Sequence, residues 1–283
     1  MIDFDAAVTF LHLNARLLER HRYACLFEDA GAKPVLAALR AYRNPDGGFG
    51  HAIEPDLRGP ASQPAGVQSA MEILHEAGAH DAELIDGAVG FLASIERPGG
   101  GVPFVLETAL EHPRGPWWQP ADATSLTQTA ANAAALHALN VDHPWLDRAS
   151  EYIWQRVEAL DFLDNAYDTR FTIGFLDHVP DGPRAEAALD ALRPRVQEAI
   201  GEDPDAPGEH HAALEFSPQP GARSRRLFND DQIERDLDAL EAGQKEDGGW
   251  TFDFPAWSPA ATLDWRGLMT VDALKVLRAN GRL

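Results

Sequence analysis

The chain has 283 residues, a formal net charge of −21 and one cysteine, and 45% of its residues are hydrophobic. This length and apolar content predict a folded protein with a substantial core. The negative charge argues against nucleic acid as a partner, and a lone cysteine excludes an intramolecular disulfide. Because there is no long apolar run and no signal-peptide pattern, we expect a cytoplasmic protein without a transmembrane segment.

Helical patterns follow one another along the chain, with apolar residues recurring every three or four positions. No segment shows a convincing strand pattern. The stretch 200–229, rich in proline, glycine, alanine and histidine, is interpreted as a long loop. Helices are predicted over 5–22, 33–43, 65–77, 81–95, 125–139, 142–160, 171–176, 185–200, 230–242 and 264–279.

A glycine-rich turn recurs between these helices, at residues 44–50, 97–104 and 244–250. The first two turns are 53 residues apart (Gly47 to Gly100) and the last two are 148 apart (Gly100 to Gly248). This spacing is close to three further units of about 50 residues, and each unit holds two helices. We therefore predict one domain over 1–283, an all-α α/α toroid in which about ten to twelve inner and outer helices are paired.

The turns resemble those of a known superfamily. Residues 244–250 read Gln-Lys-Glu-Asp-Gly-Gly-Trp, similar to the Gln-x-x-Asp-Gly-Gly-Trp turn of terpenoid cyclases and protein prenyltransferases with squalene-cyclase-type repeats. Residues 46–49 read Asp-Gly-Gly-Phe in the same frame, and 99–104 match more loosely. The resemblance implies an α/α toroid whose central cavity binds an isoprenoid or another hydrophobic small molecule.

The superfamily's catalytic motifs are absent from this chain. No Asp-x-Asp-Asp occurs, and the nearest strings, at 3–6 and 236–239, lack the final aspartate. Cys25 has no aspartate two residues before it, as the zinc site of the prenyltransferases would require, and no aspartate-rich magnesium motif is present. We therefore expect no metal and no cofactor, and the reaction mechanisms of the superfamily do not carry over.

The loop after the first turn holds the strongest candidates for catalysis. Glu54 and Asp56 are two residues apart, and such carboxyls differ in pKa when one is buried and the other pairs with an arginine. We assign both as catalytic, and His51, Arg58 and Gln63 as substrate-binding. The alternative is that Asp56 and Arg58 pair locally and Glu54 caps a backbone group.

A second loop carries Arg114, Trp117 and Trp118. Adjacent tryptophans are costly to expose, so they either fill the core or line a pocket, where their faces would attract a cation. We count all three residues as candidate substrate-binding groups.

A third cluster follows the last turn and again mixes aromatic and charged residues. We assign Asp253 as a third catalytic candidate. The substrate-binding candidates of this cluster are Trp257, Asp264, Trp265 and Arg266.

Three functions fit these residues. The first is a terpenoid-cyclase-like or prenyltransferase-like protein with a loop carboxyl as general acid. The second is a carbohydrate-active hydrolase or lyase, because α/α toroids also carry enzymes with paired carboxylates. The third is a binding domain without catalysis. An apolar, closed cavity would favour the first function, and a polar, open groove would favour the second.

Overall fold

The computed structural model describes residues 2–160, 165–200 and 211–283, and most of the regular structure in these ranges is helical. Two 3₁₀ helices, η1 (Glu107–Glu111) and η2 (Arg223–Leu227), and two strands, β1 (Val102–Pro103) and β2 (Thr124–Ser125), accompany the α-helices. The α-helices are α1 (Phe4–Asn14), α2 (Leu17–Phe27), α3 (Lys33–Leu39), α4 (Pro64–Glu76), α5 (Ala82–Ser94), α6 (Leu126–Ala138), α7 (Pro144–Ala159), α8 (Ala166–His178), α9 (Gly182–Ala199), α10 (Ala213–Phe216), α11 (Asp230–Ala242) and α12 (Pro259–Ala279).

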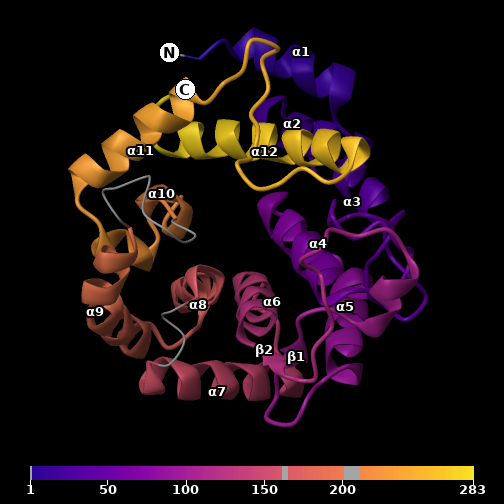
Figure 1. Cartoon of the computed structure of the whole chain (residues 1–283), viewed down its shortest axis with the longest axis vertical. Coiled ribbons are helices and arrows are strands. Elements are labelled where there is room, and N and C mark those ends of the chain that lie inside the picture. The colour runs from indigo at the N-terminus through magenta and orange to yellow at the C-terminus, as the bar shows by residue number, and fades with distance from the viewer. Residues whose placement is uncertain (1, 161–164, 201–210) are drawn as a thin grey trace.

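The helices form a ring of two layers (Figure 1). Helices α4, α6, α8 and α10 lie on the inside of the ring, and α5, α7, α9 and α11 lie outside them. Helix α12 packs against α1, α2 and α11, so the first and last helices meet. This arrangement is the predicted α/α toroid.

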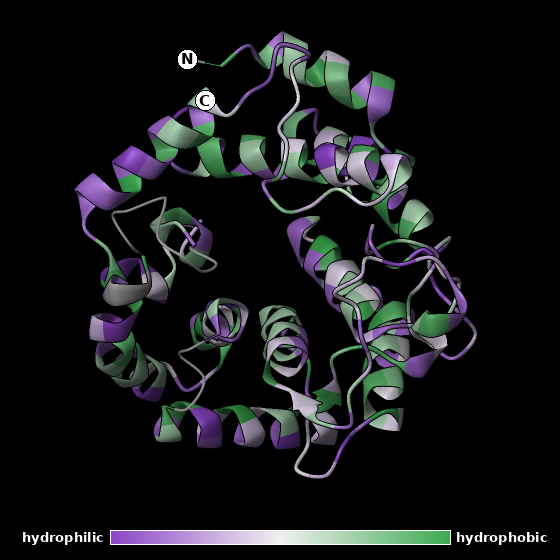
Figure 2. Cartoon of the chain, in the orientation of Figure 1, coloured by the Kyte–Doolittle hydropathy of each residue, from purple (hydrophilic) through white to green (hydrophobic). Residues whose placement is uncertain are grey.

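The hydrophobic core fills the space between the two layers. On α6, Ala130 and Ala133 are fully buried, and such small side chains let α4, α7 and α8 approach this helix closely. The outer helices alternate between hydrophobic and hydrophilic surface, as α7 shows (Figure 2). On α7, Trp145 and Ile153 are fully buried, whereas Asp147 is exposed. The inner face of an outer helix therefore belongs to the core, and its other face meets solvent.

Three turns share one hydrogen-bond pattern. In each, an amide N–H donates to the carbonyl oxygen of a glycine four residues later, and the glycine before that acceptor has a positive φ. Because the three turns repeat this geometry, they place equivalent pairs of helices around the ring. The donor–acceptor pairs are Asn44–Gly48 (2.9 Å), Arg97–Gly101 (2.7 Å) and Lys245–Gly249 (2.9 Å), and the positive-φ glycines are Gly47, Gly100 and Gly248.

The N-terminal end of the described chain is joined to the last turn where the ring closes. The Asp3 amide donates to Gln244 Oε1 (2.8 Å), and Gln244 Nε2 donates to the Asp3 carbonyl (2.7 Å). The guanidinium of Arg266 lies 4.5 Å from the centre of the Phe10 ring. The closure of the ring thus combines hydrogen bonds with a cation–π contact.

The structure changes several predicted helices. The helix expected over 171–176 is α8, which begins five residues earlier at Ala166, because the Asn165 side chain caps it by accepting from the Tyr167 and Asp168 amides. The single helix expected over 5–22 is two helices, because Ala15 and Arg16 have extended backbones with ψ of 154° and 161°. Helix α12 begins at Pro259, five residues before the predicted start, because the Ser258 side chain caps it by accepting from the Ala261 amide. The hydrophobic pattern continues across the boundary between α1 and α2, so periodicity alone does not reveal it.

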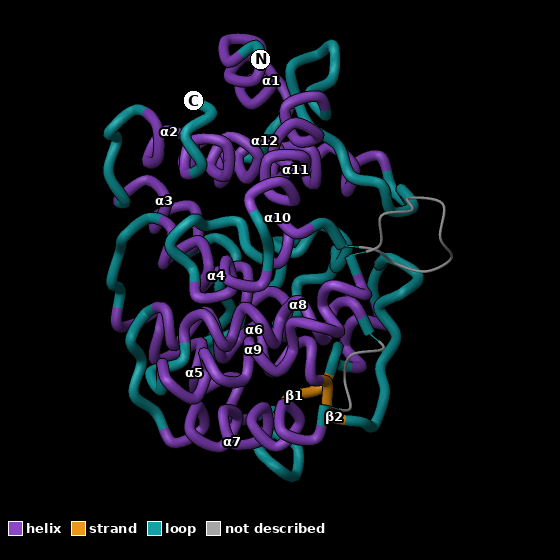
Figure 3. Tube along the Cα trace, turned by 90° about the vertical axis from the view of Figure 1, so that its left-hand side faces the viewer, coloured by secondary structure: helices purple, strands orange, loops and turns teal. Residues whose placement is uncertain are grey.

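The two short strands form an antiparallel ladder with Val102 opposite Ser125, at the margin of the ring near α7 (Figure 3). Of the predicted loop 200–229, residues 201–210 lie outside the described residues, and the remainder contains α10 and η2. None of the helices in the described ranges combines the length and the apolar character needed to span a bilayer.

Candidate functional site

The loop between α3 and α4 presents Glu54 in an environment that favours its neutral form. Burial raises the pKa of Glu54 to about 8, and the nearby Asp56 carboxyl adds to this shift. Two groups offset part of this rise in the pKa of Glu54. The Asp56 amide donates to Glu54 Oε1 (3.3 Å), and the guanidinium of Arg16 is a nearby positive charge. Glu54 is therefore mostly protonated at neutral pH and can act as a proton donor.

Asp56 lies beside Glu54 and is held by an aromatic side chain from the far end of the sequence. Asp56 is 2% exposed, and its Oδ1 accepts a hydrogen bond from the Trp257 indole N–H (2.5 Å). Burial raises the pKa of Asp56, and the Trp257 hydrogen bond partly opposes that shift. The two carboxyls thus have different partners, as an acid and a second group with another role would require.

Aromatic rings form a wall next to Asp56. Phe252 and Phe254 stack with ring centroids 4.2 Å apart, and Phe254 meets the edge of Trp265 at 5.3 Å. These three rings, Trp257 and Asp56 pack around one small hollow that leaves no room for a water-sized molecule. Aromatic faces next to a carboxyl favour positive charge beside them.

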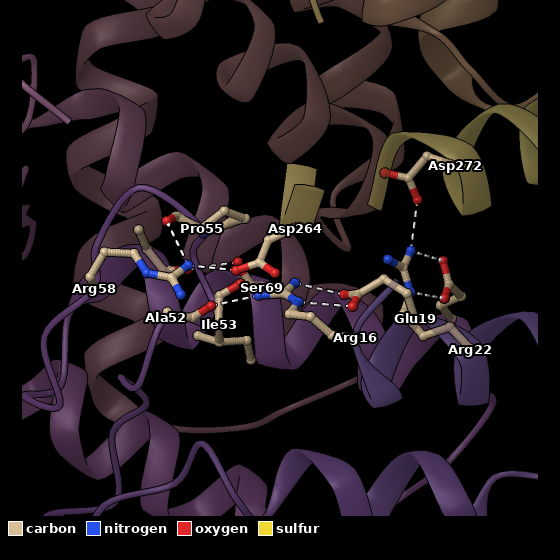
Figure 4. Close-up of polar contacts among 12 residues, drawn as sticks. Arg16, Glu19, Arg22, Ala52, Ile53, Pro55, Arg58, Ser69, Asp264 and Asp272 are labelled. Atoms are coloured by element: carbon tan, nitrogen blue, oxygen red, sulfur yellow. Dashed lines mark hydrogen bonds and ion pairs between the residues drawn. The ribbon is translucent and has the colours of Figure 1, made fainter. Parts of the chain in front are cut away.

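Arg58 joins the loop to α12. Its Nη1 pairs with the Asp264 carboxylate and donates to the Pro55 carbonyl (3.3 Å), as Figure 4 shows. Of the sequence alternative, the local pair between Asp56 and Arg58 does not form, because the partner of Arg58 comes from α12. Its other part does form, since Glu54 accepts from a backbone amide, that of Asp56 (3.3 Å). The pair of Arg58 and Asp264 fixes the loop against the helix that carries Trp265.

Arg16 and Glu19 at the start of α2 complete the site and are absent from the sequence candidates. Arg16 Nε and Nη2 donate to the two carboxylate oxygens of Glu19 (2.8 and 2.7 Å), and its Nη1 donates to the carbonyls of Ala52 (2.5 Å) and Ile53 (3.2 Å). The only local signal in the sequence is the spacing of an arginine and a glutamate three residues apart.

Three of the remaining candidates in the first two clusters support loops. Gln63 is 4% exposed and bridges the Leu106 amide (2.8 Å) and Thr108 Oγ1 (3.0 Å). Trp118 is 8% exposed and stacks on Phe104 at 4.7 Å, which corresponds to the core-filling alternative. Arg114 Nε donates to the Trp118 carbonyl (2.9 Å).

Trp117 and His51 are more accessible than these three residues. Trp117 is 36% exposed and meets the edge of Phe254 at 6.2 Å, so it lies next to the aromatic wall. His51 is exposed, and its Nε2 lies 3.0 Å from Asn44 Oδ1. The structure brings Trp117 into the site and leaves His51 at its edge.

Two candidates from the third cluster lie apart from Asp56. Arg266 holds the Asp247 carboxylate with two nitrogens (2.8 and 2.6 Å) and covers Phe10, so its contacts belong to the last turn and the ring closure. Asp253 is exposed and makes no hydrogen bond or ion pair with any described residue. No set of three or more potential ligands among the described residues could hold a metal ion.

The ring of helices matches solved structures along nearly its whole length. No protein-family model matches the chain, and no curated protein matches its sequence. A crystal structure of a protein from Actinoplanes superposes with a TM-score of 0.60 at 16% identity, covering 98% of each chain. A variant of the type II terpene cyclase MstE from Scytonema, bound to its substrate geranylgeranyl dihydroxybenzoate, superposes with a TM-score of 0.58 at 13% identity, covering 97% of this chain and 96% of the other.

The fold is that of a terpenoid cyclase. In this terpenoid-cyclase-like ring, Glu54, Asp56, Arg58, Trp257 and Asp264 gather in one place although loop and helix are about two hundred positions apart in the sequence.

The protonated Glu54 makes the stability of this terpenoid-cyclase-like protein depend on pH. Its pKa is about 8 in the folded chain against an ordinary value of 4.5, so the folded state binds the extra proton between these values. The free energy of unfolding should therefore fall as pH rises from about 5 to 8, by at most about 1.4 kcal/mol per unit. Urea unfolding of wild type and Glu54→Gln across this range tests the shift. In the variant, the free energy of unfolding should lack the fall with pH that Glu54 causes. If the free energies of the two proteins change in parallel with pH, Glu54 does not have the raised pKa.

Proposed function

We propose that this protein is an acid-initiated cyclase that acts on an isoprenoid or similar hydrophobic substrate, with Glu54 as its general acid. The observation that supports this function is a carboxyl group that keeps its proton at neutral pH and lies beside Asp56, the residue that borders the aromatic rings. A carboxylic acid that is neutral at the working pH is the form required for proton donation.

The acidity of Glu54 favours an oxygen as the proton acceptor. A carboxyl with a pKa of about 8 is a weak acid, and it protonates an epoxide oxygen more readily than an alkene carbon. The O–H proton of Glu54 would pass to the epoxide oxygen while the C–O bond breaks and the electron pair stays on the new hydroxyl. The adjacent carbon becomes positive, and an alkene of the same chain attacks it. The product carbocation then loses a proton to water, and the Glu54 carboxylate takes up a proton from solvent, which returns the acid to its starting form.

The aromatic wall has a matching role in this reaction. The faces of Trp257, Trp265 and Phe252 present negative quadrupole charge to a cation that forms beside them. Asp56, which accepts the Trp257 N–H, adds a carboxyl on the same side of the hollow. Cation stabilisation and proton donation would then come from adjacent groups.

A second candidate, a carbohydrate-active enzyme, is favoured by charges on the inner helices. Glu72 of α4 is exposed, and desolvation by the surrounding protein nevertheless raises the pKa of its carboxyl. On α12, Lys275 Nζ pairs with Glu76 (2.7 Å) and lies near Asp272 (3.5 Å). Such polar groups suit hydroxyl-rich ligands better than hydrocarbon chains.

Mass-spectrometric screening of the purified protein separates the two functions. The panel contains prenyl diphosphates, squalene, a terminal epoxide of squalene and oligosaccharides. We expect an isomer of the epoxide as product, with no change in mass, because cyclisation adds and removes no atoms. Turnover of a sugar with no turnover of any isoprenoid would overturn the proposed function in favour of the second candidate.

A further inference from the structure

The turn that leads into Glu54 is held in an unfavourable backbone conformation. His51 and Ala52 both have positive φ, 56° and 62°, although neither is glycine. Two consecutive side chains in the left-handed region are uncommon, because the Cβ of each crowds its own backbone. Such a turn persists only where its surroundings hold it, and strain of this kind gathers at functional sites.

Arg16 supplies side-chain contacts to this turn, in addition to the backbone hydrogen bonds from the His51 amide to the Gly59 carbonyl (2.9 Å) and from the Ile53 amide to the Gly50 carbonyl (3.1 Å). Its Nη1 donates to the carbonyls of Ala52 and Ile53, the two residues directly before Glu54 (Figure 4). Its other two nitrogens are fixed by Glu19, whose side chain is fully buried. The planar guanidinium is thus clamped on one side and bonded to the turn on the other, which a lysine ammonium could not reproduce.

We propose that Arg16, oriented by Glu19, is a positioning residue that helps to hold the strained turn and thereby fixes the position of the Glu54 carboxyl. This inference rests on the proposed role of Glu54 as an acid. Arg16 does not touch the aromatic hollow beside Asp56, so it acts through the backbone of the loop and not on the substrate.

Helix α2 offers a matched control. Arg22 is also buried, at 4% exposure, and it also holds a carboxylate with two nitrogens, those of Glu76 at 2.7 and 2.9 Å. It additionally pairs with Asp272 at 2.7 Å, and none of its contacts reaches the turn before Glu54. Arg22→Lys should therefore weaken the fold as Arg16→Lys does and leave Glu54 in place.

The experiment measures the pKa of Glu54 in the substrate-free protein by ¹³C NMR of labelled glutamate carboxyls, assigned with Glu54→Gln. In Arg16→Lys the positive charge remains, but the turn loses the guanidinium that binds the Ala52 and Ile53 carbonyls. The Glu54 carboxyl should therefore become more hydrated. Its pKa should fall from about 8 towards 4.5 by about one unit or more. In Arg22→Lys the pKa should stay at the wild-type value.

An equal pKa in all three proteins, with both variants folded, would overturn the proposal. If Arg16→Lys fails to fold, the double variant Arg16→Lys with Ala52→Gly replaces it, because glycine adopts the left-handed turn without strain. Restored folding with a pKa near 8 supports the proposal, and continued failure to fold overturns it by showing that Arg16 acts on more than the turn. The readout needs no substrate, so a wrong substrate class leaves the result interpretable.

Discussion

Glu54→Gln should lower turnover of the substrate by a factor of about 10² to 10⁴, the range that a general acid contributes. The amide keeps the size of the side chain and the uncharged state that Glu54 has at neutral pH, so the fold and the binding of substrate should change little. What it removes is the transferable proton. The loss should therefore appear in kcat, with KM nearly unchanged.

The control for this variant is Glu83→Gln, the same chemical change on α5, where the carboxylate is 67% exposed and pairs with Arg43. This variant should turn over substrate at the wild-type rate. Steady-state kinetics of the three proteins at pH 6 to 9 decide the matter. A Glu54→Gln protein that keeps more than about a tenth of the wild-type kcat would remove Glu54 from the acid role. In the wild type, kcat/KM should fall as pH rises through about 8, because the acid of the free enzyme then loses its proton.

Gly248→Ala should destabilise the protein by about 3 kcal/mol or more, the sum of a left-handed backbone penalty and a steric clash. Gly248 has a φ of 91°, and a Cβ there would lie 2.2 Å from the carbonyl oxygen of Ala6. That oxygen belongs to the backbone of α1, which cannot rotate away as a side chain can. The substitution would therefore push the last turn off the first helix.

Gly281→Ala separates the two causes. Gly281 has a φ of 72°, and a Cβ there would meet no atom within 4 Å. It should cost only about 1 to 2 kcal/mol, the backbone penalty alone. Chemical denaturation of both variants measures the difference, and equal losses would show that contact with Ala6 contributes nothing.

The sequence predicts the ring and the loop of this site because both depend on local signals. Pro-Asp-Gly-Gly and Asp-Gly-Gly-Trp specify turns by their own backbone chemistry, and the periodic apolar residues specify helices. Two carboxylates and an arginine within five residues make the loop after the first turn conspicuous. The prediction that Glu54 and Asp56 differ in pKa assumes that one of them pairs with an arginine, whereas Arg58 pairs with Asp264 and Asp56 accepts from Trp257.

The partners of these residues are not predictable in the same way. Trp257 bonds to Asp56 across 201 positions, and Asp264 meets Arg58 across 206, because the ring closes on itself. Arg16 looks like one more polar residue of a helix, and its role appears only when α2 lies beside the loop. Arg266 is conspicuous next to Trp265, yet it covers Phe10 at the closure.

The closure of the ring also bears on how the chain folds. Apart from the contacts of α12 with α1 and α2, neighbouring helices are consecutive or next but one in the sequence, as α4 and α6 or α6 and α8 are, so most of the ring connects segments that are close along the chain. The hydrogen bonds between Asp3 and Gln244 are different, because they connect positions 241 residues apart. Forming them costs the entropy of closing this long loop in a single step. This seam would form last, and Asp264 reaches Arg58 across the same boundary. The loop between α3 and α4, which carries Glu54, would therefore reach its final conformation only when the ring has closed.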